Sequence, residues 1–283
     1  MLKRALTTLV GLPVLLASVW WGAPWFTVLV AAAAVLAIWE FYRLIPGDPR
    51  ASQAGQPPIV IGALWVAALV LGGQATTGTE NFLVISAGIL AVGAFITLLW
   101  FIGFSPGSPG RQEYLTLIYL LAGGVYVGFL LAHGPALREF GPPGNPELGR
   151  GLLILALLAV FAADTGAYFT GRSVGKHPLA PGISPNKTWE GSAGGLASAA
   201  VASLILGQVL DLAMPVWQLG LLGVIIGVVA QIGDLAESKL KRLSGVKDTG
   251  SIIPGHGGIL DRLDSVVVSI PAVYYFVVMA VKP

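Results

Sequence analysis

Charged side chains gather in one short segment of an otherwise apolar chain. Ten of the charged residues, which number 16 basic and 14 acidic in the whole chain, lie between Asp234 and Asp264. Asp234 ends a long apolar run, and Asp261 and Asp264 open the next one from a single expected helical turn. Three such carboxylates form an oxygen-rich site suited to a hard divalent cation. We therefore predict a metal site at Asp234, Asp261 and Asp264, although helix N-termini also favour acidic residues as caps.

The apolar run before Asp234 continues into a polar face with helical spacing. Asp234, Glu237, Ser238 and Lys241 recur every three or four residues, so a helix would place them on one face. Charges that only set the membrane topology would explain lysines and arginines at this helix end. They would not explain a carboxylate, because a carboxylate close to the acyl chains is energetically unfavourable.

A glycine-rich loop follows this helix. Four glycines and one proline lie between Lys247 and Gly258, and such a backbone lets a ligand approach the main chain closely. Free N–H groups near a helix N-terminus suit phosphate. The flanking cations are Lys239, Lys241, Arg242 and Lys247. Together these residues predict a cradle for a polyphosphate, although His256 alone would more often be a turn residue.

A third polar group precedes these two. Asp164 lies inside an apolar run, and a carboxylate inside a membrane helix is by default a functional-site hypothesis. Polar residues follow it at Arg172, Lys176, Ser184, Asn186, Lys187 and Thr188. The three cations among them could hold a lipid phosphate, or could only set topology and attract anionic lipid.

The elements that must position these residues are membrane helices. The chain has 283 residues, of which 55% are hydrophobic and 11% charged, against about 25% charged in soluble proteins. We predict an all-α polytopic membrane protein, because lipid cannot satisfy exposed backbone groups. Its nine spans are expected at about 5–21, 24–45, 58–74, 82–104, 114–134, 150–171, 193–211, 216–234 and 263–281. The absence of cysteine from the sequence excludes disulfides and thiolate metal sites.

Basic residues predict the orientation. With a cytoplasmic N-terminus and an outer C-terminus, 13 Lys and Arg residues face the cytoplasm and 3 face outward, as the positive-inside rule requires. The polar loops 172–192 and 235–262 then face the cytoplasm. We divide the chain into 1–135, with about five spans, and a catalytic region at 136–283. The net charge of only +2, with the basic residues between apolar runs, argues against nucleic-acid binding.

The polar segments resemble a known family. The pattern S-x-L-K-R-x4-K-D-x-G-x2-I-P-x-H-G-G-I-x-D-R-L-D, from Ser238 to Asp264, is similar to the signature of phosphatidate cytidylyltransferases, also called CDP-diacylglycerol synthases. D-T-x-A-Y at 164–168 and S-P-x-K-T-x-E at 184–190 also look like that family. The specific similarity covers roughly residues 160–265, and the first five helices resemble the family only in hydropathy.

This resemblance implies an enzyme that joins CTP and phosphatidate into CDP-diacylglycerol and releases pyrophosphate. It implies Mg²⁺ at Asp234, Asp261 and Asp264, with a second cation, K⁺ or another divalent ion, beside it. Lys241 and Lys187 are expected to take part in catalysis. The residues expected to contact substrate are Asp164, Arg172, Lys176, Ser184, Asn186, Thr188, Ser238, Lys239, Arg242, Lys247, Asp248, His256, Gly257, Gly258 and Arg262. The expected location is a prokaryotic-type inner membrane, with the active site facing the cytoplasm.

Two other functions remain open at this point. A CTP-dependent polyprenol kinase would transfer the γ-phosphate to a lipid alcohol, would need a general base and would release CDP. An ion-coupled transporter would place ionisable residues near the bilayer midplane, whereas these gather at the expected cytoplasmic edge. Small residues on the helix faces permit a homodimer without requiring one.

Overall fold

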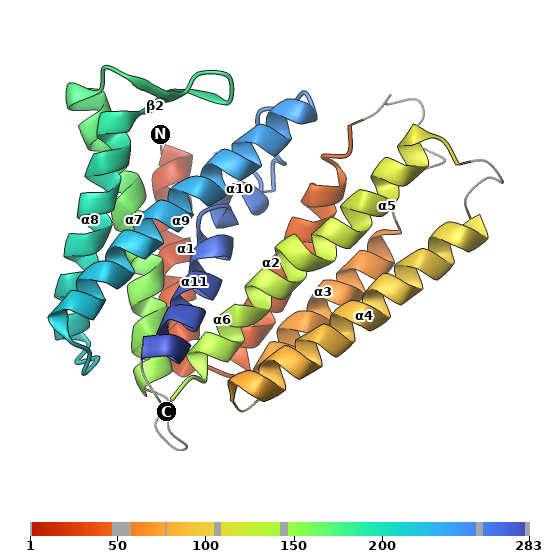
Figure 1. Ribbon diagram of the computed structural model, residues 1–283, viewed down its shortest axis with the longest axis horizontal. Helices are drawn as coiled ribbons and strands as arrows, with labels where there is room; N and C mark the ends of the chain where they lie inside the picture. The colour runs from red at the N-terminus through yellow and green to blue at the C-terminus, as the bar shows by residue number, and fades with distance from the viewer. Residues whose placement is uncertain are drawn as a thin grey trace. The chain divides into compact units, whose positions relative to one another are not determined.

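The described residues form long apolar helices and one short hairpin (Figure 1). The computed structural model describes residues 2–46, 58–76, 78–104, 109–141, 147–252 and 257–280. Contacts divide the chain into two compact units. Unit 1 is Met1–Ala136 with Leu240–Arg262, and unit 2 is Leu137–Lys239 with Leu263–Pro283. The division of the chain at residue 135 into two consecutive segments stays a prediction.

Unit 1 contains the first helices and the glycine-rich loop. Its helices are α1 (Leu2–Trp21), α2 (Trp25–Tyr42), α3 (Ile59–Gln74), α4 (Thr79–Phe104), α5 (Arg111–Gly123), the π-helix η2 (Gly124–Phe129) and α6 (Leu130–Arg138). The elements α5, η2 and α6 form one continuous helical segment, as Figure 1 shows. Trp65 of α3 covers Gly93 of α4 and Gly124 of η2, where any side chain would overlap its indole. The helices of this unit therefore pack closely at small residues, as is common in lipid.

Unit 2 contains the helices that carry the upstream motifs. They are α7 (Glu147–Val174), α8 (Trp189–Val209), α9 (Val216–Leu243), which reaches Lys239 in this unit, and α11 (Val266–Ala280). Gly166 of α7 lies against Ser198 of α8, and Gly223 of α9 lies against the backbone of Ala199 and Ala200. These close contacts bring the polar ends of α7, α8 and α9 together.

A β-hairpin stands within the predicted polar loop 172–192. Its strands β1 (Pro178–Ala180) and β2 (Ser184–Thr188) pair antiparallel, with Pro178 opposite Thr188. The hydroxyl of Thr188 then accepts the N–H of Gly191 at 3.1 Å and caps α8. The hairpin was not predicted, but the all-α class is confirmed, because in the described part of the chain these are the only strands.

The described residues contain seven helices that are long and apolar enough to cross a membrane. The chain is therefore an integral membrane protein. The predicted spans 5–21 and 58–74 correspond to shorter apolar helices, at Leu9–Trp21 and Ile59–Gln74. The count of nine spans and the orientation stay predictions.

The prediction that one helical turn carries both Asp261 and Asp264 is wrong. α10 (Leu260–Leu263) ends before Asp264, and α11 starts at Val266. The Oδ1 atom of Asp264 accepts the N–H of Ser265 at 2.6 Å. Such local bonds of an aspartate compete with helical hydrogen bonding, so the helix is interrupted here.

Candidate functional site

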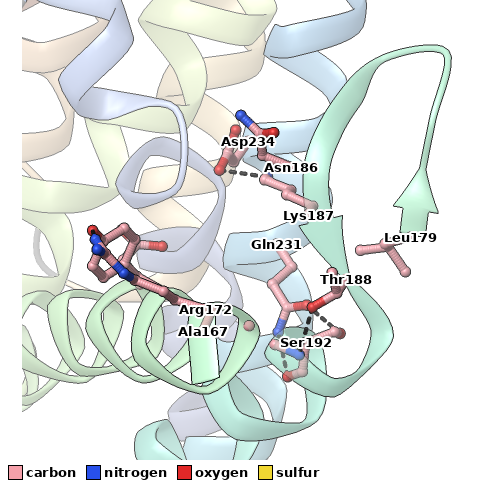
Figure 2. A pocket seen from close by; sticks show the side chains of 13 residues that line it. Ala167, Arg172, Leu179, Asn186, Lys187, Thr188, Ser192, Gln231 and Asp234 are labelled. Carbon is pink, nitrogen blue, oxygen red and sulfur yellow. Dashed lines mark hydrogen bonds and ion pairs between the residues drawn. The ribbon is translucent and has the colours of Figure 1, made fainter. Parts of the chain in front are cut away.

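A cavity of about 480 Å³ opens in unit 2 between the ends of α7, α8 and α9 and the hairpin (Figure 2). Six of the predicted site residues line it: Asp164, Arg172, Asn186, Lys187, Thr188 and Asp234. These residues come from three separate motif segments of the sequence. The cavity has the size of a ligand pocket, and its wall carries both carboxylates and cations.

Lys187 and Asp234 form the charged pair of this cavity. Lys187 of β2 reaches across, and its Nζ lies 2.5 Å from Oδ2 of Asp234 on α9. Figure 2 shows the two side chains pointing toward each other. Ser238, one turn further along α9, donates to Oδ1 of Asp234 at 3.2 Å. About 30% of each side chain is exposed (27% and 30%), so an anionic ligand or a cation can reach the pair.

Two further pairs of cavity residues are joined by polar contacts. Arg172 donates to the hydroxyl of Tyr168 at 2.8 Å, which steadies the guanidinium at the end of α7. Gln231 of α9 bonds Ser192 of α8 through both its amide oxygen and its amide nitrogen. Helix ends that are tied in this way give the cavity a defined wall.

Glu190 fixes the base of the hairpin rather than the cavity. Its carboxylate accepts the backbone N–H groups of Lys176 and His177 at 3.1 and 3.3 Å, and pairs with the His177 ring at 2.5 Å. Lys176 and Ser184 are not among the described residues that line the cavity. Their contacts with substrate stay predictions.

Asp261 is the centre of the predicted loop in unit 1. Its Oδ1 accepts the ammonium of Lys241 at 2.8 Å. Its Oδ2 accepts the N–H groups of Thr249 at 2.9 Å and Gly258 at 2.8 Å, and lies 2.9 Å from the Thr249 hydroxyl. Gly257 has a φ of +84°, which glycine adopts without strain. Asp261 therefore ties both sides of the glycine-rich loop to the end of α9.

The other predicted residues of this region are mostly exposed. They are Lys239, Arg242, Lys247, Asp248 and Arg262. Arg242 makes a long contact of 3.4 Å with the carbonyl of Val246, which leaves its guanidinium near the loop. His256 lies outside the described residues. An exposed set with four cations suits an anionic ligand.

Two carboxylates of the predicted metal site, Asp234 and Asp264, belong to unit 2. The backbone of Asp264 lies against Gly233, the residue before Asp234. Within the described part of each unit, no three Asp, Glu or His side chains form a group that could hold a metal. Mg²⁺ is usually held by one or two carboxylates together with substrate phosphates. The metal site at Asp234, Asp261 and Asp264 stays a prediction.

Two polar residues of these regions escaped the sequence analysis. Gln231 lines the cavity, and its position before Asp234 on an apolar helix carried no distinctive pattern. Glu40 lies in α2 and contacts Thr249 of the glycine-rich loop. The sequence did contain a signal for Glu40, because it is a carboxylate inside an apolar run. The same signal singled out Asp164.

Comparison with known proteins gives consistent matches along the whole chain. The family model described as "Cytidylyltransferase family" matches residues 2–280. A phosphatidate cytidylyltransferase of Bacillus subtilis is 33% identical over 279 residues, which is 99% of this chain and 98% of that protein. One of Staphylococcus epidermidis is 40% identical over 164 residues, 58% of this chain and 60% of that protein. One of Brucella suis is 41% identical over 162 residues, 57% of this chain and 58% of that protein. The alignments with the last two thus span less than two thirds of those relatives.

Proposed function

Because the chain belongs to the cytidylyltransferase family, we propose that it is a phosphatidate cytidylyltransferase. It joins CTP to phosphatidate, forms CDP-diacylglycerol and releases pyrophosphate. Within the structure, one observation supports this most: the cavity of unit 2 collects cations and carboxylates from three motif segments. The full-length similarity to the Bacillus subtilis protein supports the same reaction.

The reaction needs charge neutralisation more than it needs a base. A phosphate oxygen of phosphatidate attacks the α-phosphorus of CTP, a new P–O bond forms, and the bond to the β-phosphate oxygen breaks. The nucleophile is already an anion, so the main difficulty is to bring two anions together. Positioning and electrostatic stabilisation therefore carry most of the catalysis.

The unit 2 cavity suits the head group of phosphatidate. Arg172 and Lys187 supply positive charge for its phosphate, and Asn186 and Thr188 supply polar groups. Exposed aromatic side chains stand on the same helix ends: Tyr168 is 58%, Phe169 62% and Trp189 61% exposed. Aromatic side chains are typical of the membrane–water boundary, where the head group would lie while the acyl chains stay in the leaflet.

The nucleotide is assigned to the basic segment and the glycine-rich loop. Lys239, Lys241, Arg242 and Lys247 would neutralise the triphosphate and steady the leaving pyrophosphate. Glycines 257 and 258 would let the phosphates approach the backbone. Ser238, Asp248, His256 and Arg262 would complete this segment, and Asp164 and Lys176 would assist at the lipid side.

Cytidylyltransferases generally use a divalent cation, and we assign Mg²⁺ to Asp234, Asp261 and Asp264. When bound, it would neutralise phosphate oxygens and the charge that develops on the leaving group. Lys187 would hold Asp234 in place, and its ammonium would supply positive charge for substrate phosphate. A second cation, K⁺ or another divalent ion, would lie beside the first.

The proposed location is a prokaryotic-type inner membrane, with the site on the cytoplasmic side where CTP is available. The distribution of basic residues, 13 against 3, supports this orientation.

One assay separates the candidate functions. Purified protein is incubated with phosphatidate, Mg²⁺ and CTP labelled at the α-phosphate. We expect the label in CDP-diacylglycerol, with one pyrophosphate released per lipid, and no product when diacylglycerol replaces phosphatidate or when EDTA is added. CDP release with a polyprenol instead would indicate the lipid kinase. An absence of any nucleotide turnover would leave the transporter as the better interpretation.

Arg172→Ala is expected to raise the KM for phosphatidate about 10- to 100-fold, because a charged hydrogen bond to phosphate is lost. The KM for CTP should stay within about twofold, because CTP is assigned to the other segment. Steady-state kinetics in mixed micelles measure both constants. Arg111→Ala, which removes an exposed cation at the start of α5, is the matched control. An unchanged KM for phosphatidate in Arg172→Ala would contradict the assignment of the cavity to the head group.

A further inference from the structure

Glu40 is a buried carboxylate inside the apolar helix α2. Its side chain has 0% exposure, and α2 is long and apolar enough to cross a membrane. Among the described residues no cationic side chain pairs with it. Arg43, on the next turn, places its guanidinium 4.7 Å over the ring of Trp39 instead. Burial of an ionisable group in such a place costs free energy unless hydrogen bonds or charge pairing offset it, so its contacts indicate what it does.

The partners of Glu40 lie more than 200 residues away along the chain. Its Oε2 atom accepts the backbone N–H of Leu260 at 2.8 Å and lies 3.2 Å from the hydroxyl of Thr249. Leu260 opens α10 just after the glycine-rich loop, and Thr249 lies near the start of that loop. One carboxylate oxygen of an N-terminal helix therefore contacts a residue near each end of this loop, and all three residues belong to unit 1.

Two glycines let the loop backbone lie directly on this carboxylate. A Cβ atom at Gly250 would overlap Oε1 of Glu40, and one at Gly258 would overlap Oε2. Oε1 has no hydrogen-bond partner among the described residues. The close approach requires glycine at both positions, so the loop sequence and Glu40 are matched to each other.

Asp261 is a second carboxylate that contacts Thr249 and the end of the glycine-rich loop. It bonds the N–H groups of Thr249 and Gly258, while Glu40 bonds the N–H of Leu260. The Thr249 hydroxyl lies within reach of both carboxylates and can donate its single proton to only one of them at a time. Thr249 thus lies between two carboxylates, and within the described part of the chain only Asp261 of the two has an ammonium partner, Lys241.

We propose that Glu40 is a positioning residue for the nucleotide end of the reaction. It fixes Thr249 near the start of the glycine-rich loop and Leu260 just after its end. Gly250, Gly258 and the cations that precede the loop are thereby set for the triphosphate. This inference rests on the proposed function and gives the N-terminal helices a part in catalysis. Glu40 itself acts through the loop and does not touch substrate.

A purely packing role would predict something different. A carboxylate that only fills space in α2 could be replaced by an isosteric amide or a small apolar residue, with an effect on folding alone. A positioning role predicts an effect on CTP and not on phosphatidate. It also predicts that glutamine, which keeps one acceptor oxygen for Leu260, rescues most of the function.

The test compares Glu40→Ala, Glu40→Gln and the control Glu80→Gln, which removes an exposed carboxylate from α4. In the purified full-length protein we expect Glu40→Ala to raise the KM for CTP at least about 10-fold, since the hydrogen bond from Leu260 and the shared contact with Thr249 are lost. The KM of Glu40→Gln for CTP should stay within about fivefold of the wild-type value. The KM for phosphatidate should change by less than about twofold in every variant.

Hydrogen exchange supplies a readout that does not depend on turnover. Peptides that cover 246–262 should exchange at least about 10-fold faster in Glu40→Ala, and at the unchanged rate in Glu80→Gln. If Glu40→Ala does not fold, Gly250→Ala separates the loop from Glu40 while the carboxylate stays in place. It should raise the KM for CTP in the same way.

The outcomes distinguish this inference from the proposed function. If the unchanged protein makes no CDP-diacylglycerol, the proposed function fails, and the exchange data still decide whether Glu40 holds the loop. If the unchanged protein is active but folded Glu40→Ala keeps its KM for CTP and its loop protection, only the role of Glu40 is overturned. Equal changes in both KM values would also overturn it.

Discussion

Asp261→Ala is expected to lower CDP-diacylglycerol formation about a thousandfold or more, the scale of losing a central electrostatic group in a transfer reaction. The carboxylate accepts bonds from Lys241, Thr249 and Gly258, so its removal frees the loop and leaves an ammonium without its partner. The proposed Mg²⁺ would lose a ligand at the same time. Single-turnover measurements at saturating CTP and phosphatidate would show the loss in the chemical step.

Protein folding has to be controlled in this experiment. Side chains of Lys241 and Asp261 are only 12% and 6% exposed, and breaking a buried pair destabilises a protein by about 3–5 kcal/mol. Asp261→Asn keeps the side-chain volume and one acceptor for the loop N–H groups. Its unfolding temperature should therefore be closer to the wild-type value than that of Asp261→Ala. It should still lose about a hundredfold or more in activity, because the charge is gone. A fully active Asp261→Asn would refute a role for the charge.

Asp234→Asn is expected to lower activity about a thousandfold, and Lys187→Met about a hundredfold. Their side chains meet at 2.5 Å in the wall of the cavity, and both remain accessible. Asparagine removes the charge that would attract Mg²⁺, and methionine removes the cation that would neutralise the lipid phosphate. The double variant should be no worse than Asp234→Asn, because groups that act as a unit are not additive.

Initial rates over a range of Mg²⁺ concentrations test this pair. Asp234→Asn should need at least about 10-fold more Mg²⁺ for half-maximal rate, since a carboxylate ligand is lost. Asp211→Asn is the control, because Asp211 is an exposed aspartate after α8 that lies outside the cavity. A fully additive double variant would mean that Lys187 and Asp234 act independently, and an unchanged Mg²⁺ requirement would remove Asp234 from the metal site.

Local patterns predicted the helices well and their interruptions poorly. The apolar run before Asp234 and the spacing of Ser238 and Lys241 correctly indicated one helix, which extends to Leu243. The same spacing argument failed at Asp264, because the side chain bonds the next backbone N–H and stops α10. Periodicity indicates which residues share a helix face. It does not reveal a side chain that competes with the helical hydrogen bonds of the backbone.

The sequence by itself determined the membrane setting, the helical class and the kinds of chemical group that the site contains. These depend on hydropathy and residue type, which are properties of short segments. Only the tertiary structure decided which groups meet: Lys187 with Asp234, Asp261 with Lys241 and the loop, and Glu40 with Leu260. The last contact joins residues 220 positions apart. Helix packing sets such contacts, and no local pattern in either segment specifies the other.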